Sequence, residues 1–361
     1  MTGTGSGRPP QTEAAEITHR RVSIRDVAEA VGVSSTTVSH ALNGVAGARV
    51  AEDTRARIRE AADRLGYTPS RVARSLRLRR TGTLGMLSDH IATTPHAGLI
   101  ILGAQEAALA RGWTLLLVNT GDDPARQAQG VTTLVQHQVD GILYATMYHR
   151  EVRVPAGLGG LPTVLLDARC ADARIPAVVP DEVAGGRAAV DELLRHGHRR
   201  IGFALNRDDI PATHGRLRGY RDALAAAGIE HDPRLVVTEE SEARGGYLAA
   251  SRLLDGQPPP TAIFCFNDRM AMGAYRVASE RGLAIPRDLS VIGFDNQAII
   301  AEGLYPPLST VALPHYEMGQ WAVETLIHRL EAGGDEQPAA AYPVLMPCPL
   351  VVRDSVAPPG G

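Results

Sequence analysis

The chain has 361 residues, of which 44% are hydrophobic, so it is long and apolar enough to form two or three packed domains. No apolar run reaches the roughly 18–20 residues of a membrane span, which argues against a membrane protein. Its three cysteines, Cys170, Cys265 and Cys348, lack Cys-x-x-Cys spacing and favour reduced thiols in a cytoplasm over a disulfide framework.

Charge is spread unevenly along the chain. The formal net charge is −3, and all 37 basic residues are arginines. Residues 17–82 hold thirteen arginines and six acidic residues, a net +7, which leaves −10 for the rest. A basic head on an acidic body indicates that only the head meets a polyanion, although a solvated helical surface would carry the same charges.

Residues 23–43 predict two short helices around a tight turn. Ser23, with Asp26 three residues on, gives a capping-box-like start, and Gly32 allows the turn. Ser34 can then cap the second helix. This arrangement is typical of a helix-turn-helix that reads DNA.

The second of these helices is predicted to expose small polar side chains. Helical spacing turns Val38 and Leu42 inward. The outward face then consists of Ser35, Thr36, Ser39 and His40. Hydroxyls and an imidazole can read base edges in a groove of DNA. The alternative is a helical bundle that binds protein.

A third helix is expected at about 52–65, closed by Gly66, and a basic segment follows it. Pro69 can start a helix there, but the stretch Ser70–Leu76 is too short to be stable alone. We therefore expect it to fold only against a partner, and its arginines favour DNA as part of that partner.

From Val27 the chain reads Val-Ala-x-x-x-Gly-Val-Ser-x-x-Thr-Val-Ser-x-x-Leu-Asn-Gly, then Thr-Arg-x-x-Ile, then Leu-Gly-Tyr-x-Pro-x-x-x-Ala-x-x-Leu. This pattern resembles the lactose-repressor (LacI/GalR) family, and the resemblance continues almost to the C-terminus. It implies that the second helix enters the major groove, and that a hinge helix at 70–76 folds on operator DNA as a dimer pair.

The resemblance also implies which residues contact DNA. The family's base-reading positions match Ser35, Thr36 and His40, and its hinge leucine matches Leu76, which would wedge into the minor groove and kink the duplex. The full set of expected DNA contacts is Ser23, Ser34, Ser35, Thr36, Thr37, Ser39, His40, Asn43, Arg71, Ala73 and Leu76.

Three positions depart from the family pattern. His40 stands where many members carry arginine, which leaves the base preference there open. Ala51 replaces a serine that caps the third helix, a loss of about 1 kcal/mol that Glu52 and Asp53 partly offset at the helix's positive end. The loop Val45–Arg49 is about two residues longer than is common.

From Thr83 onward, short apolar runs alternate with helical patterns, which predicts parallel sheets covered by helices on both faces. The predicted strands are 83–87, 114–119, 141–145, 163–167, 200–205, 261–266 and 289–294. The predicted helices are about 98–112, 124–138, 183–197, 214–228, 243–255, 268–282 and 314–332. Two such α/β units are expected, split near residue 180.

The resemblance implies the two-lobed, type I periplasmic-binding-protein-like fold, in which the chain crosses between lobes three times, here near 180, 310 and 338. The expected organisation is a disordered tail at 1–20, a helix-turn-helix domain at 21–68, a hinge helix and linker at 69–82, an effector-binding and dimerisation domain at 83–353, and a tail at 354–361. The lobes are then about 83–180 with 311–337, and about 181–310 with 338–353.

Polar residues follow the predicted strands of the body, at the edge where α/β sheets bind ligands. The resemblance matches Arg216 and Asp295 to the family's effector contacts and Asn267 to a third. Asp167 ends a predicted strand and is either a contact or a turn residue, and Asp268 is expected to be a helix N-cap. His96 stands where relatives often carry an aromatic that stacks on the ligand, which completes the predicted effector site of His96, Asp167, Arg216, Asn267 and Asp295.

No catalytic, cofactor or metal motif is found: Gly-x-Ser-x-Gly, a Walker-type loop and His-Glu-x-x-His are absent, and His196-Gly-His198 lacks further ligands. The sequence therefore predicts a cytoplasmic, nucleoid-associated repressor and not an enzyme. We expect a homodimer, paired through the 98–112 region, that binds a near-palindromic operator and responds to a sugar-like effector. An activator or a corepressor-dependent regulator remains open, as does a sugar-binding protein that does not bind DNA.

Overall fold

The computed structural model describes residues 22–43, 50–67, 80–94, 97–158, 160–332 and 343–360. They belong to two units, a head within residues 1–79 and a body from Arg80 onward. The tail at 1–20, the loop Val45–Arg49 and the predicted hinge helix with Arg71, Ala73 and Leu76 lie outside the described residues, as does His96.

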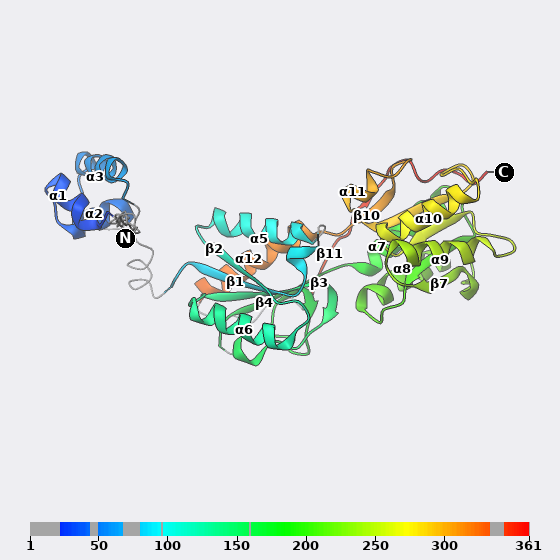
Figure 1. Cartoon of the computed structure of the whole chain (residues 1–361), viewed down its shortest axis with the longest axis horizontal. Helices are drawn as coiled ribbons and strands as arrows, with labels where there is room; N and C mark the ends of the chain where they lie inside the picture. The colour runs from blue at the N-terminus through cyan, green and yellow to red at the C-terminus, as the bar shows by residue number, and fades with distance from the viewer. Residues whose placement is uncertain are drawn as a thin grey trace, which may run out of the picture. The chain divides into compact units, whose positions relative to one another are not determined.

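The described part of the head is a bundle of three helices, α1 (Ile24–Val31), α2 (Ser35–Asn43) and α3 (Glu52–Leu65) (Figure 1). Its small core packs one apolar face from each helix, with Val27, Val38 and Ile58 fully buried. Gly32 and Gly66 end α1 and α3 in the left-handed conformation that favours glycine, with φ values of 74° and 68°.

The helix ends of the head follow the sequence expectations. Asp26 accepts hydrogen bonds from the Ser23 N–H at 2.7 Å and the Ser23 hydroxyl at 2.8 Å. The Ser34 hydroxyl oxygen accepts from the Thr37 N–H at 3.1 Å and so caps α2. Ala51 occupies the N-cap of α3 without a side-chain hydrogen bond, as predicted.

The described residues of the body form two six-stranded sheets, one in each lobe (Figure 1). The first sheet has the order β11-β5-β4-β3-β1-β2 and contains β1 (Thr83–Ser88), β2 (Thr114–Asn119), β3 (Gly141–Glu151), β4 (Thr163–Arg169), β5 (Ala177–Pro180) and β11 (Val344–Met346). The second has the order β12-β10-β9-β8-β6-β7 and contains β6 (Ile201–Asn206), β7 (Val236–Glu239), β8 (Ala262–Cys265), β9 (Ser290–Asp295), β10 (Ser309–Ala312) and β12 (Leu350–Val351). Every pairing is parallel except that of β10 with β12.

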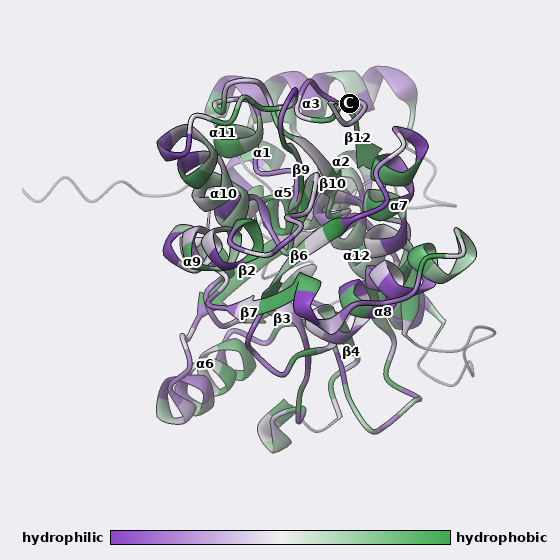
Figure 2. Ribbon diagram, turned by 90° about the vertical axis from the view of Figure 1, so that its right-hand side faces the viewer, coloured by the Kyte–Doolittle hydropathy of each residue, from purple (hydrophilic) through white to green (hydrophobic). Residues whose placement is uncertain are grey.

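Helices cover both faces of the sheets, as the alternating pattern predicted. The α-helices are α5 (Gly98–Ala110), α6 (Pro124–Gln136), α7 (Glu182–Arg195), α8 (Pro211–Ala226), α9 (Ala243–Leu254), α10 (Asp268–Glu280), α11 (Ala298–Ala301) and α12 (His315–Glu331). Single 3₁₀ turns are η1 (Ile91–Thr93), η2 (Ala156–Leu158) and η3 (Pro233–Leu235). Figure 2 shows α6 alternating between green and purple along its turns, as expected of a helix with one face on a sheet.

Glycines let neighbouring helices of the body touch backbone to backbone. A Cβ on Gly103 of α5 would lie 2.0 Å from the Tyr316 carbonyl oxygen of α12, and one on Gly319 of α12 would lie 2.3 Å from that of Ile100. The same reciprocal contact joins two further helix pairs, α7 with α8 through Gly186 and Gly219, and α9 with α10 through Gly246 and Gly273. A side chain at any of these positions would force the two helices apart.

The crossings between lobes differ from the expected positions. We assigned 338–353 to the second lobe, but Val344–Met346 pairs with β5 of the first sheet, and the chain joins the second sheet only at Leu350–Val351. The pairing supplies partners for a sheet edge that would otherwise be open. Strand β10 belongs to the second sheet through residue 312. The second crossing between the lobes therefore comes after residue 312, slightly later than the expected position near 310.

The C-terminal tail was predicted to begin at residue 354, but the second lobe extends beyond this residue. Ser355 is fully buried and binds β9 twice, because the Val291 N–H donates to its carbonyl oxygen at 3.0 Å and its hydroxyl donates to the Val291 carbonyl at 2.6 Å. The second lobe therefore includes at least this residue.

Candidate functional site

Helix α2 presents the predicted recognition surface of the head. Thr36 is exposed, Ser35, Ser39 and His40 are half-buried, and Leu42 packs partly against the core. The side chain of Asn43 lies outside the described residues. The hydroxyls of Ser23, Ser34 and Thr37 lie at the two helix starts, where Ser34 Oγ and Thr37 Oγ1 are 2.9 Å apart. These groups are small, polar and close to helix N-termini, which suits contacts to DNA.

A pocket of about 220 Å³ lies between the two lobes of the body. The first lobe contributes Met147, Tyr148, His149 and Asp167, and the remaining lining comes from the second lobe and the crossing after β10. Four predicted effector residues meet in it, although they are far apart in the sequence: Asp167, Arg216, Asn267 and Asp295.

Arg216 is the central cation of this pocket. Its Nε donates to a Glu182 carboxylate oxygen at 2.7 Å, and its Nη1 donates to the Phe266 carbonyl and, at 3.4 Å, to Asp295. Its guanidinium carbon also lies 3.6 Å from the centre of the Phe294 ring. Glycines bring α7 and α8 close enough for the buried pair Arg216–Glu182 to form.

Asp167 faces the pocket from β4. It is only 2% exposed, it adopts a φ of 54°, and its Oδ1 has no hydrogen-bond partner among the described residues. Burial, reinforced by the charge of Glu182, raises the pKa of Asp167 well above its usual value. Asp167 therefore lines the pocket with a buried carboxyl oxygen that has no partner among the described residues, and its contact with a ligand stays a prediction.

Asp295 and Asn267 are both held in place by their neighbours. Asp295 has a φ of 101° and accepts from the Gln297 side-chain amide at 3.0 Å. The Asn267 oxygen accepts from the Met270 N–H at 2.9 Å, and its amide donates to the Ser241 carbonyl at 2.9 Å. Asn267 is thus the N-cap of α10 as well as a wall of the pocket.

The prediction that Asp268 is a helix N-cap is wrong, because Asn267 takes that place. Asp268 instead accepts from the Thr310 hydroxyl at 2.6 Å and the Gln297 N–H at 2.7 Å. Burial raises its pKa to about 8. Asp268 thereby links α10 to β10 and to the segment after β9, and it is not among the residues that line the pocket.

Several residues that line the interlobe pocket were not predicted from the sequence. Of the four phenylalanines, Phe266 lines the pocket, whereas Phe203, Phe264 and Phe294 are fully buried. The missed polar residues are Tyr148, His149, Glu182, Asn206, Asp208, Ser241, Glu242 and Arg269. Asn206 and Asp208 follow a predicted strand, which was the available signal for them.

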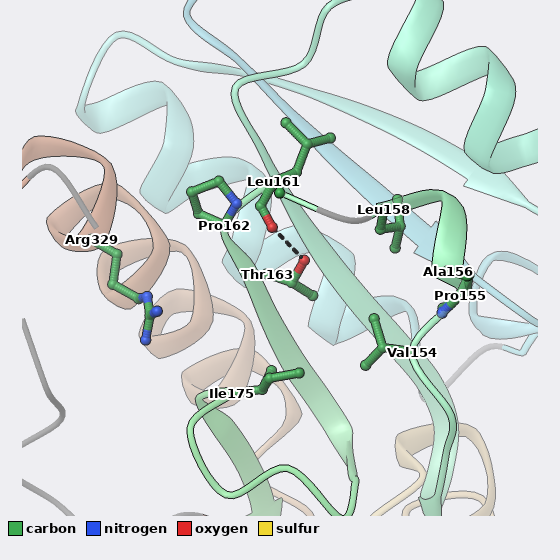
Figure 3. Close-up of a pocket in the computed structure, with 10 residues that line it drawn as sticks. Val154, Pro155, Ala156, Leu158, Leu161, Pro162, Thr163, Ile175 and Arg329 are labelled. Carbon is green, nitrogen blue, oxygen red and sulfur yellow. Dashed lines mark hydrogen bonds between the residues drawn. The ribbon is translucent and has the colours of Figure 1, made fainter. Parts of the chain in front are cut away.

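A second hollow of about 480 Å³ lies on the first lobe alone (Figure 3). Its labelled walls are mainly aliphatic, including Val154, Leu158 and Ile175, with Arg329 at one side. The Thr163 hydroxyl is occupied, because it donates to the Leu161 carbonyl at 3.0 Å. The interlobe pocket, with its converging polar groups, is the better ligand site.

The described residues contain no group of His, Cys, Asp and Glu side chains placed to hold a metal ion. The His196-Gly-His198 stretch is structural, since His198 is buried with its Nδ1 2.9 Å from the Thr261 hydroxyl. No described helix is long and apolar enough to cross a membrane.

Residues 23–70 match the family model of bacterial regulatory proteins, lacI family, and residues 190–356 match a periplasmic binding protein-like domain. The ribose operon repressor of Haemophilus influenzae is 33% identical over 337 residues, covering 92% of this chain and 98% of the relative. The chain belongs to the lacI family of bacterial regulatory proteins.

Other similarities agree with this family. The HTH-type transcriptional repressor PurR of Vibrio atlanticus is 36% identical over 310 residues, covering 85% of this chain and 92% of the relative. A crystal structure of the lac repressor dimer bound to operator and the anti-inducer ONPF matches with a TM-score of 0.75 and 26% identity, covering 94% of this chain and all of that one. The chain is a DNA-binding transcriptional repressor regulated by a small-molecule effector, and not an enzyme.

Proposed function

We propose that this lacI-family repressor binds a sugar or sugar derivative in the interlobe pocket, and that the ligand sets its affinity for operator DNA. The observation that carries the proposal is the convergence of Asp167, Arg216, Asn267 and Asp295 on one small pocket. Carboxylates accept hydrogen bonds from hydroxyls and the guanidinium and amide donate to them, so the set suits a neutral polyhydroxylated ring. His96 lies outside the described residues, and its contact with the effector stays a prediction.

The head is proposed to read a near-palindromic operator, as two copies of a helix-turn-helix do. The proposed base contacts are Ser35, Thr36 and His40, with phosphate or sugar contacts from Ser23, Ser34, Thr37, Ser39 and Asn43. Arg71, Ala73 and Leu76 complete the interface from the proposed hinge helix. Since its partner is chromosomal DNA, the protein acts in the cytoplasm at the nucleoid.

We further propose a homodimer paired through α5. Leu99, Leu102 and Leu109 of this helix are exposed, Leu109 by 60%, and exposed leucines on one helix favour a protein interface. Sedimentation of the full chain checks this, because Leu102→Glu should convert a dimer into a monomer. A wild-type monomer at micromolar concentration would contradict the proposal.

The central experiment measures operator affinity with and without sugar. Selection from random DNA with the full chain gives the operator, and fluorescence anisotropy then follows binding with ribose and other simple sugars added. Ribose comes first because relatives are named ribose operon repressors. We expect one sugar to weaken operator binding at least tenfold. A sugar that tightens binding would indicate a corepressor, and a panel without effect would refute a sugar effector.

A further inference from the structure

The hollow on the first lobe that Figure 3 shows has walls that are almost entirely apolar. They come from residues 154–158 and 160–163, between β3 and the start of β4, and from Ile175, which precedes β5. Apart from Thr163 and Arg329, every residue in the described lining is Val, Leu, Ile, Pro, Ala or Gly. Its volume of about 480 Å³ is in the range of small-molecule sites.

Several polar groups of these walls already have partners within the protein. The N–H groups of Leu158, Leu161 and Ile175 each donate to a carbonyl three residues earlier, at 3.0, 3.0 and 3.1 Å. The Thr163 hydroxyl donates to the Leu161 carbonyl. None of these four groups has a hydrogen left to donate to a ligand.

Arg329 differs, because its guanidinium keeps donors that the described residues do not use. It is half-buried in the last turn of α12 and extends along one side of the hollow, with Val154 and Ala156 at the other (Figure 3). Its Nε is buried without a hydrogen-bond partner among the described residues. Its Nη1 donates to the Arg174 carbonyl at 3.5 Å, at the long limit of a hydrogen bond. A buried donor of this kind indicates a missing acceptor.

One cation beside aliphatic walls defines the chemistry of that acceptor. A carboxylate matches the fork of donors on a guanidinium and neutralises its charge. An apolar body attached to the carboxylate would remove the walls from water. A sugar fits this hollow poorly, because most of its hydroxyls would lose water without gaining a partner.

We propose that this hollow binds a medium-chain aliphatic carboxylate, with the carboxylate on Arg329 and the chain against Val154, Leu161 and Ile175. The site lies within the first lobe, and the inference does not depend on the proposed sugar effector.

The hollow and the interlobe pocket lie toward opposite ends of β4. Thr163 begins the strand and lines the hollow, whereas Asp167 lines the interlobe pocket four residues further on. At about 3.3 Å per residue, the two positions are about 13 Å apart. The carboxylate and the proposed sugar therefore do not compete for the same residues.

Titration calorimetry on the full chain tests the proposal with octanoate, butyrate and octan-1-ol. Octanoate should bind at least tenfold more tightly than butyrate, because its longer chain buries more apolar surface. It should also bind at least tenfold more tightly than octan-1-ol, which has the same chain without the charge. Arg329→Met, which keeps an unbranched stem, should lower octanoate affinity at least tenfold and change that of octan-1-ol less than threefold. Arg329→Lys should retain part of the preference for the carboxylate.

The control is Arg174→Met, the same change at a neighbouring arginine whose side chain is 88% exposed and does not line the hollow. It should leave octanoate affinity unchanged. Octanoate that fails to bind at millimolar concentration, or that binds no better than octan-1-ol, would overturn the proposal. Octanoate binding that Arg329→Met leaves intact would do the same, because the carboxylate would then lie elsewhere. Each of these outcomes leaves the sugar effector standing.

Discussion

The two walls of the interlobe pocket differ in how far their polar groups are satisfied. On the second-lobe wall, Arg216, Asn267 and Asp295 all have hydrogen-bond partners within the protein. On the first-lobe wall, Asp167 and His149 are buried with polar atoms that lack partners among the described residues. The second-lobe wall is thus preorganised, and the first-lobe wall gains most from a ligand.

This difference in hydrogen-bond satisfaction between the two walls suggests how a ligand could stabilise one arrangement of the lobes. In the proposed sugar complex, ligand hydroxyls that pair with Asp167 and His149 would remove a penalty present only in the ligand-free protein, while Arg216 and Asp295 would hold the same ligand from the other lobe. Binding therefore favours the arrangement in which both walls face the ligand, which is the differential affinity that a population shift requires.

The largest effect is expected from a substitution of Arg216 on the second-lobe wall. Arg216→Met should lower the free energy of unfolding by about 3–5 kcal/mol, because Glu182 would remain buried without its cation. Denaturant unfolding measures the change. The double variant Arg216→Met, Glu182→Leu should recover much of it, and a double variant as unstable as the single one would contradict the buried-pair explanation.

Asp295→Ala tests the same wall through ligand affinity. Hydrogen bonds to a charged group contribute about 1.5–3 kcal/mol, so the affinity for the sugar should fall about 10- to 100-fold. Titration calorimetry gives the value, and Asp222→Ala, on the exposed face of α8, serves as the matched control. An affinity within twofold of wild type would remove Asp295 from the site.

On the first-lobe wall, His149 should make stability depend on pH. Burial, with the positive charges of Arg169 and Arg216, lowers its folded pKa to about 4, below the ordinary 6.5, so the unfolded chain binds more protons between these values and stability falls as pH drops through them. From pH 8 to pH 5, wild type should lose about 2 kcal/mol that His149→Phe retains. Parallel unfolding curves for the two proteins would show that His149 is not buried as a neutral group.

Asp167 should show a pH dependence of stability of the opposite sign. Its pKa is raised on folding, so the folded protein binds more protons above the ordinary pKa and stability falls as pH rises. Asp167→Asn, which tolerates the left-handed backbone, should gain about 1 kcal/mol over wild type at pH 8 and lose ligand affinity. A variant less stable than wild type at pH 8 would contradict an unsatisfied carboxyl.

The comparison also explains what the sequence could predict. Asn267 follows an apolar run that predicts a strand, and Asp295 ends another. Ser34 precedes a helix with apolar periodicity. Local sequence patterns were therefore sufficient to predict where these three residues lie in the fold. His149 depends on a register shift between β3 and β4, which only the pairing of distant segments creates. The strand Val344–Met346 was missed because three residues are too short to show a period.

The glycine contact between α5 and α12 has a mechanical consequence. At Gly103 and Gly319 the two backbones meet without intervening side chains, which leaves no compressible layer to absorb a displacement. Helix α12 starts at His315, just after the crossing that follows β10, and α5 carries the exposed leucines. A rotation of that crossing would therefore be transmitted to α5 without loss, and the proposed dimer surface on α5 would turn with it.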